Sequence, residues 1–121
     1  MTATIEVAMD ALDADASADF WQEALGYPNR YRRDPYVVLV PEESDGRPRV
    51  VVQQVDAVTP DKTPVHVDLR VDDPDAEVER LRTMGATVEW VTDDTASGGT
   101  RWTTMADPWG ILFCVCPARK E

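Results

Sequence analysis

The stretch from residue 66 to residue 71 alternates side chains that could do chemistry with apolar ones. Its polar positions are His66, Asp68 and Arg70. A period of two predicts a strand, so the three polar side chains share one face and the apolar ones pack on the other. A guanidinium can hold a carboxylate through two hydrogen bonds, and an imidazole can bind a ligand or move a proton. The same alternation also fits an ordinary solvated face whose Asp–Arg pair contributes little.

Two cysteines offer a second chemistry. Cys114 and Cys116 lie two residues apart on a predicted strand, which is poor geometry for a disulfide, so we expect thiols in a reducing cytoplasm. Thiolate and imidazole suit zinc, and Cys114 with His66 would need a further ligand, such as Asp68, to converge with them. The chain has a single histidine and no CxxC spacing, which favours two small buried side chains instead.

Trp102 is the aromatic residue best placed to line a pocket, because it lies on a predicted strand beside Thr103 and Thr104. The other tryptophans and the tyrosines are expected in the core or in an interface. The glycine-rich stretch 95–100 lacks the lysine of a phosphate-binding loop, and no serine has a nucleophile-elbow context. Nucleophilic catalysis is therefore unsupported.

Composition limits the class of protein. The chain has 121 residues, with 12 Lys and Arg against 23 Asp and Glu, so its net charge is −11. A field of that sign repels nucleic-acid phosphates and anionic lipid surfaces, so we expect neither as a partner. The first residues include no basic segment followed by a long apolar run, so neither a signal peptide nor a membrane span is expected. The length suits one domain.

Apolar periodicity and turn residues predict one order of elements, which occurs twice. The first half predicts a strand, a helix and three strands, at residues 4–12, 13–25, 31–33, 36–40 and 49–55. A segment with linker composition follows at 56–64. The same order then returns at residues 66–71, 74–84, 87–91, 100–105 and 111–116.

Both predicted helices have recognisable ends. Gly26 and Gly85 are expected to end them, and Asp73 caps the second helix ahead of Pro74. We expect the buried sides to consist of Phe20, Trp21, Ala24 and Leu25 in the first helix and of Val78, Leu81 and Met84 in the second.

The repeated order indicates a diverged duplication. Gly26 and Gly85 are 59 residues apart, and the same offset pairs Val7 with His66. We therefore predict a single domain over residues 1–121, with βαβββ units over about 1–58 and 63–117.

Three segments resemble the vicinal oxygen chelate superfamily. They are His-Val-Asp-Leu-Arg-Val-Asp-Asp at 66–73, Phe-Trp-Gln-Glu-Ala-Leu-Gly-Tyr at 20–27 and the hairpin at 102–116. Within the superfamily the match is to the glyoxalase-like branch, alongside bleomycin-resistance proteins and extradiol dioxygenases. The resemblance implies an α+β fold whose eight strands form a half-open mixed sheet around a cleft, with the helices on its outer face.

The resemblance also implies up to four metal ligands, one each from the first and last strand of each unit. In this chain those positions are Val7, Gln53, His66 and Cys114. Valine cannot bind a metal and glutamine is a weak ligand, so we expect no complete metal site and no tightly held cofactor. The expected function is binding of a small organic molecule in the cleft. The expected binding residues are His66, Asp68, Arg70, Gln53, Trp102 and Cys114.

Two other functions stay open. A divalent metal held weakly by His66 with Gln53 or Cys114 would make the chain a lyase, isomerase or dioxygenase, with His66 as the candidate catalytic residue. A structural or interaction subunit would instead fill the cleft with its own side chains.

The last turn departs from the resemblance. Members of the branch commonly have Asp-Pro-Glu-Gly-Asn-Glu where this chain has Trp109, Ile111 and Leu112 in place of Glu, Asn and Glu. Three apolar replacements would suit a more hydrophobic ligand, a sheet edge that is covered, or a subunit contact. The resemblance implies a homodimer, and residues 109–112 are a candidate contact.

Overall fold

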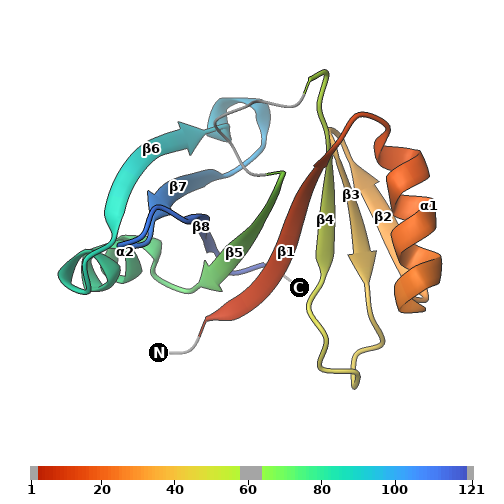
Figure 1. Ribbon diagram of the computed structural model, residues 1–121, viewed down its shortest axis with the longest axis horizontal. Coiled ribbons are helices and arrows are strands. Elements are labelled where there is room, and N and C mark those ends of the chain that lie inside the picture. The colour runs from red at the N-terminus through yellow and green to blue at the C-terminus, as the bar shows by residue number, and fades with distance from the viewer. Residues whose placement is uncertain (1–2, 58–63, 120–121) are drawn as a thin grey trace. The chain divides into compact units, whose positions relative to one another are not determined.

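The computed structural model describes residues 3–57 and 64–119, and the order strand–helix–three strands occurs twice in it (Figure 1). The linker expected at 56–64 lies mostly outside the described residues. The first set of elements is β1 (Thr4–Ala11), α1 (Ala14–Leu25), β2 (Asn29–Arg33), β3 (Tyr36–Val40) and β4 (Val50–Gln54). The second is β5 (Val65–Val71), α2 (Pro74–Thr83), β6 (Thr87–Asp93), β7 (Arg101–Ala106) and β8 (Leu112–Pro117). A short 3-10 turn, η1 (Thr95–Ser97), lies within the stretch expected to be a glycine-rich loop.

The α+β class and the eight-stranded mixed sheet expected from the sequence are confirmed. Within the described residues the strand order is β2-β3-β4-β1-β5-β8-β7-β6, so the sheet is open, with β2 and β6 at its edges. The chain divides into two compact units, and the boundary falls inside β5. The first unit is Glu6–His66, and the second contains the described residues from Val67 onward with those before Glu6.

In the first unit, α1 packs on one face of β1, β3 and β4. β1 pairs with β4 in parallel, and β2–β3–β4 is antiparallel. The helix begins after Asp13, whose carboxylate accepts a hydrogen bond from the Ala16 amide at 3.0 Å, and it ends at Gly26 in the left-handed conformation (φ +70°). The core beneath the helix consists of Ala14, Ala18, Tyr27, Val37, Leu39, Val50 and Val52.

The buried side expected for this helix is wrong in part. Ala14 and Ala18 are buried against the strands, with Leu25 packed beside them, whereas Phe20 is 63% exposed and Trp21 is 37% exposed. A helical repeat of 3.6 residues places positions 14, 18 and 25 on one stripe. The two alanines allow the helix backbone to approach the sheet closely, and this leaves the larger aromatic side chains at the helix flank.

In the second unit, α2 packs on one face of β5, β7 and β8. Val71, Met105 and Val115 form the buried cluster, and Val78 and Leu81 of the helix pack against it, as expected. Asp73 caps the helix ahead of Pro74, and its carboxylate accepts from the Ala76 amide at 3.1 Å. Met84, expected to be buried, is 64% exposed, because α2 ends at Thr83 and the chain turns away there.

Glu77 of α2 is a buried carboxylate held by Arg80 through two hydrogen bonds, Nε–Oε1 at 2.5 Å and Nη2–Oε2 at 3.1 Å. The hydrogen bonding of Arg80 to Glu77 lowers the pKa of Glu77 below its ordinary value. A depressed folded-state pKa stabilises the fold above the unfolded pKa, and this contribution is lost as pH falls through the folded value.

We therefore expect Glu77→Gln to lower the free energy of unfolding at pH 7. The loss should become smaller as the pH falls below the ordinary pKa of a glutamate side chain. Urea unfolding of both proteins at pH 7 and pH 3 measures the difference. Glu79→Gln, at an exposed position on the same helix, is the control and should change little at either pH. If Glu77→Gln lowered the free energy of unfolding equally at pH 7 and pH 3, the stabilising role of the ionised carboxylate would be contradicted.

None of the helices in the described residues has the length and apolar character needed to cross a membrane.

Candidate functional site

Asp68 and Arg70, two of the sequence-predicted polar side chains of β5, lie on the face of the second unit that points away from α2. Val71, Met105 and Val115 pack toward α2, and alternate residues of a strand point to opposite faces. We call the opposite side the helix-free face. It carries Asp68 and Arg70 of β5, Trp102 and Thr104 of β7, and Cys114 and Cys116 of β8. Along β5 the same face continues to His66, the last residue of the first unit.

Strand register brings these side chains together in rows. Asp68 lies opposite Cys114 in the parallel β5–β8 pair, and Cys114 lies opposite Thr104 in the antiparallel β7–β8 pair. Thr104 is in turn opposite Trp90 on β6. The row therefore runs from an acid through a thiol and a hydroxyl to an indole, so polar groups and an aromatic ring share one surface.

Three potential metal ligands converge at one end of this row. The ligand atoms of His66, Asp68 and Cys114 all lie within 4.8 Å of one another. Asp68 and Cys114 are buried and His66 is half-buried. The Thr104 hydroxyl lies 3.4 Å from the Cys114 Sγ, at hydrogen-bond distance, and so fixes the thiol from the other side.

The donor set fits a divalent metal. Imidazole nitrogen, carboxylate oxygen and thiolate sulfur are the ligands that zinc takes, and three protein ligands leave one position for water or a substrate. The sequence analysis left open whether Asp68 lies within reach of His66 and Cys114, and in the structure it does.

Arg70 lies one row further along β5, opposite Cys116. One guanidinium nitrogen, Nη1, donates to the Pro117 carbonyl at 3.2 Å, which anchors the half-buried side chain at the end of β8. Trp102, also half-buried, is opposite Thr92 on β6. The helix-free face thus combines a cation with aromatic rings. Cys114 and Cys116 are both buried thiols, as expected.

Gln53 lies in the first unit. It is opposite Tyr36 of β3 and Asp10 of β1, so it points away from α1. The buried cluster that contains Ala8 and Val51 lies on the same side of the strands. Its part in a common site with His66 stays a prediction.

The equivalence of Val7 with His66 is wrong by one residue. Val7 packs against the core under α1, on the opposite side of its strand from Gln53. β1 ends at Ala11, opposite Gln54 and two residues before the helix cap Asp13, as β5 ends at Val71, opposite Pro117 and two residues before the helix cap Asp73. Ala11 therefore corresponds to Val71, and Glu6 corresponds to His66. Glu6 is a buried carboxylate, 4% exposed, so the first strand has a side chain with ligand atoms where the second has the histidine.

Sequence reasoning missed Thr104 and Trp90 as members of the face. Trp90 was expected in the core or in an interface, and it is 46% exposed. The register shifts between Val88 and Trp90, so simple alternation along β6 gives the wrong face beyond the irregularity.

Comparison with known proteins adds a family and a fold. The model of the glyoxalase-like domain family matches residues 6–116. No curated protein matches the sequence.

Several solved structures share the fold at low sequence identity. An NAD-dependent benzaldehyde dehydrogenase from Legionella pneumophila has a TM-score of 0.70 at 10% identity, covering 95% of this chain and 99% of that one. A Streptomyces coelicolor methylmalonyl-CoA epimerase variant in complex with 2-nitronate-propionyl-CoA has a TM-score of 0.67 at 18% identity, with 99% of each chain covered. A glyoxalase/bleomycin resistance protein/dioxygenase superfamily member from Vibrio splendidus 12B01 has a TM-score of 0.60 at 18% identity, covering 96% and 99%.

Proposed function

The chain belongs to the glyoxalase-like domain family, and from this premise we propose that it binds a small organic molecule on the helix-free face of its second unit. The observation that carries the proposal is the gathering of His66, Asp68, Arg70 and Trp102 on one face by strand register. A ligand site typically combines an apolar or aromatic wall with a few polar groups that fix orientation, and this face has both.

The side chains on this face favour a particular ligand class. Arg70 offers a fixed, forked donor that suits a carboxylate. Trp102 offers an aromatic surface for an apolar body. The ligand that fits both is a small organic anion, such as an aromatic carboxylate. The structure of the Streptomyces coelicolor epimerase contains an organic acyl-CoA analogue, which supports this fold as a carrier of organic ligands.

Replacing Arg70 by alanine should weaken binding of such an anion roughly 10- to 100-fold, because a hydrogen-bonded charge partner is lost. A thermal-shift screen of aromatic carboxylates selects the probe, and calorimetric titration measures its dissociation constant.

Arg101→Ala is the matched control, since Arg101 lies on the same unit but its side chain reaches Asp75 at the start of α2. Arg70→Lys keeps the positive charge but loses the paired donors of the guanidinium, so its dissociation constant should lie between those of the wild type and Arg70→Ala. Equal affinities for the wild type and Arg70→Ala would remove Arg70 from the site, whatever the change in melting temperature.

A second function is favoured by the convergence of His66, Asp68 and Cys114. We propose these three residues as the ligands of a divalent metal, in place of the partial set with Gln53. A bound divalent ion supplies Lewis-acid polarisation of a substrate oxygen. His66, Asp68 and Cys114 would hold it, while Arg70 would orient an anionic substrate beside it. The reaction class would then be that of a lyase, isomerase or dioxygenase.

The homodimer and the cytoplasmic location expected from the sequence stay predictions.

A further inference from the structure

A buried hydroxyl lies beside the three converging ligand residues without being one of them. Thr104 and Cys114 face each other across the antiparallel β7–β8 pair, and the Thr104 Oγ1 is 3.4 Å from the Cys114 Sγ. The two residues are 5% and 7% exposed. Asp68 lies opposite Cys114 on β5, the other neighbour of β8, so the cysteine has the threonine on one side and the acid on the other.

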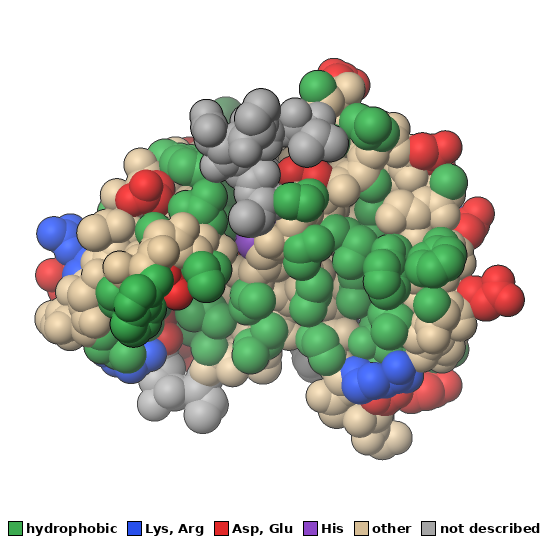
Figure 2. All heavy atoms as spheres, in the orientation of Figure 1, with side chains coloured by type: hydrophobic (Ala, Val, Ile, Leu, Met, Phe, Trp, Pro, Cys, Tyr) green, Lys and Arg blue, Asp and Glu red, His purple; other side chains and the backbone are tan. Residues whose placement is uncertain are grey.

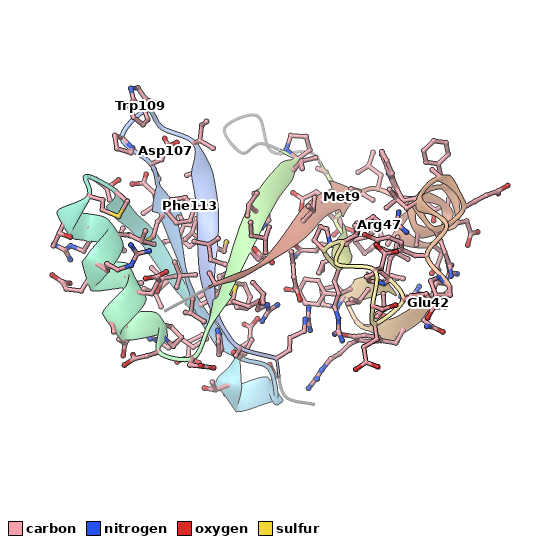
Figure 3. All side chains as sticks on the ribbon, turned by 90° about the horizontal axis from the view of Figure 1, so that it is seen from below. Met9, Glu42, Arg47, Asp107, Trp109 and Phe113 are labelled. Atoms are coloured by element: carbon pink, nitrogen blue, oxygen red, sulfur yellow. The ribbon has the colours of Figure 1, made fainter. Side chains whose placement is uncertain are left out.

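The sheet, and no loop, places this pair. Phe113 (Figure 3) and Val115 pack in the apolar cluster under α2, so Cys114 between them points to the helix-free face. Met105 belongs to the same cluster, so Thr104 before it points the same way as Cys114. The contact between hydroxyl and sulfur therefore follows from strand alternation and register, which hold both side chains in place.

The direction of this hydrogen bond is fixed once the sulfur is a metal ligand. A cysteine binds zinc as a thiolate, which has no proton and can only accept. The Thr104 hydroxyl is then the donor. A hydrogen bond to a charged acceptor is stronger and more directional than one between neutral groups, so it restricts rotation of the Cys114 side chain.

That restriction keeps the sulfur within reach of the other ligands. A cysteine side chain has one torsion with three staggered positions, and a sulfur turned away would leave the metal with an imidazole and a carboxylate. In the position beside the hydroxyl, the ligand atoms of His66, Asp68 and Cys114 lie within 4.8 Å of one another. Hydrogen bonds that orient metal ligands in this way commonly contribute about 10- to 100-fold to metal affinity.

We propose that Thr104 is the positioning residue of the metal centre, and that by holding the Cys114 sulfur it makes the centre select zinc and cobalt over manganese and magnesium. This inference rests on the metal centre proposed above. A set of sulfur, nitrogen and oxygen donors suits zinc, whereas manganese and magnesium take oxygen donors. A centre that keeps its thiolate discriminates between these classes of cation, and a centre whose thiolate has turned away does not.

Access and charge alone would not discriminate between cations. Asp68 and Cys114 are buried, but His66 is half-buried, and the only histidine of the chain reaches the surface in Figure 2 (purple). A net charge of −11 favours the approach of any cation. Selection must therefore come from the donor set and from the side chain that orients it.

Three variants of β7 test this role. Thr104→Val removes the hydroxyl at nearly constant volume, and Thr104→Ser retains it. Thr103→Val makes the same change at the adjacent buried residue, which lies opposite Val115 on the α2 side of the strand. Competition with a chelating dye at pH 7 measures the dissociation constants of zinc and manganese. Cobalt(II) reports on the sulfur directly, through the thiolate-to-metal charge-transfer band in the near ultraviolet.

Zinc should bind Thr104→Val about tenfold more weakly than the wild type, because the sulfur is no longer held. Manganese affinity should change less than about twofold, since it depends on the oxygen donor. The cobalt charge-transfer band should lose intensity. Thr104→Ser should stay within about threefold of the wild type for zinc, because serine keeps the donor but can occupy three rotamers. Thr103→Val should match the wild type in all three measurements.

The far-UV spectra of the metal-free proteins control for folding. If Thr104→Val folds poorly, Thr104→Ala removes the hydroxyl without an added methyl group, and it should show the same selective loss of zinc affinity.

The outcomes separate this role from the metal centre itself. A Thr104→Val variant that binds zinc like the wild type would overturn the positioning role and leave the centre standing. Equal losses of zinc and manganese affinity, or an equal loss in Thr103→Val, would also overturn it, because a general change in the fold would explain them. A wild type that binds manganese as tightly as zinc would overturn the selectivity. A wild type that binds neither ion would refute the metal centre together with this inference.

Discussion

Zinc affinity should fall at least roughly 100-fold when His66 is replaced by alanine, because a site with three protein ligands is left with two. Competition with a chelating dye at pH 7 measures the dissociation constant without any assay of turnover. Stability gives a second readout. Free zinc at 100 times its dissociation constant should raise the free energy of unfolding of the wild type by about 2.7 kcal/mol, and this gain should vanish in the variant.

The two cysteines provide a matched pair for the same prediction. Cys114 belongs to the converging group, whereas Cys116 lies two residues further along the same strand and face. Cys114→Ser should weaken zinc binding as His66→Ala does, and Cys116→Ser should leave it close to the wild-type value. A wild type that binds no zinc, or equal effects of the two serine variants, would refute the metal centre and leave the organic-ligand proposal standing.

Replacing Leu39 by alanine should have the largest effect on stability. Leu39 is fully buried at 0% exposure, in the cluster between α1 and the strands of the first unit. Removing three buried carbon atoms there costs their transfer free energy and leaves a cavity, together about 2–5 kcal/mol.

Urea denaturation at 25 °C followed by circular dichroism measures that loss. Leu12→Ala, at a residue 60% exposed just before α1, is the control and should change the free energy of unfolding by about 0.5 kcal/mol or less. A loss below about 1 kcal/mol for Leu39→Ala would mean that the core under α1 can collapse around the gap.

Local patterns in the sequence were sufficient for the elements and for one face of the site. The alternation at residues 66–71 identified the polar face of β5. Asp73 ahead of Pro74 marked the start of α2, and Gly26 marked the end of α1. Each of these signals depends on a few neighbouring residues, which a single sequence displays directly.

The convergence of His66, Asp68 and Cys114 depended on information that no local pattern contains. Asp68 meets Cys114 through the register of β5 on β8, and these residues are far apart in the chain. Apolar alternation indicates which face a residue occupies, but it does not indicate the partner across the strand pair. The sequence therefore allowed a third ligand without showing that it was in reach.

The two errors in alignment and packing have separate physical causes. The offset between the helix-ending glycines does not hold in the strands, so it paired His66 with Val7, whereas the strand ends and helix caps pair it with Glu6. In α1 the larger hydrophobic residues were expected inside, but close packing of the helix favoured Ala14 and Ala18. This arrangement is also what leaves Trp21 37% exposed at the helix flank.

The most direct test of organic-ligand binding is a nitrogen–proton correlation spectrum of the labelled protein, recorded during titration with the best aromatic carboxylate from the thermal-shift screen. We expect saturable shifts in the amides of β5, β7 and β8, centred on residues 66–70 and 114–116, together with the side-chain N–H of Trp102. Shifts confined to α1 and β1, or no saturable shifts with any carboxylate, would contradict a ligand site on the helix-free face of the second unit.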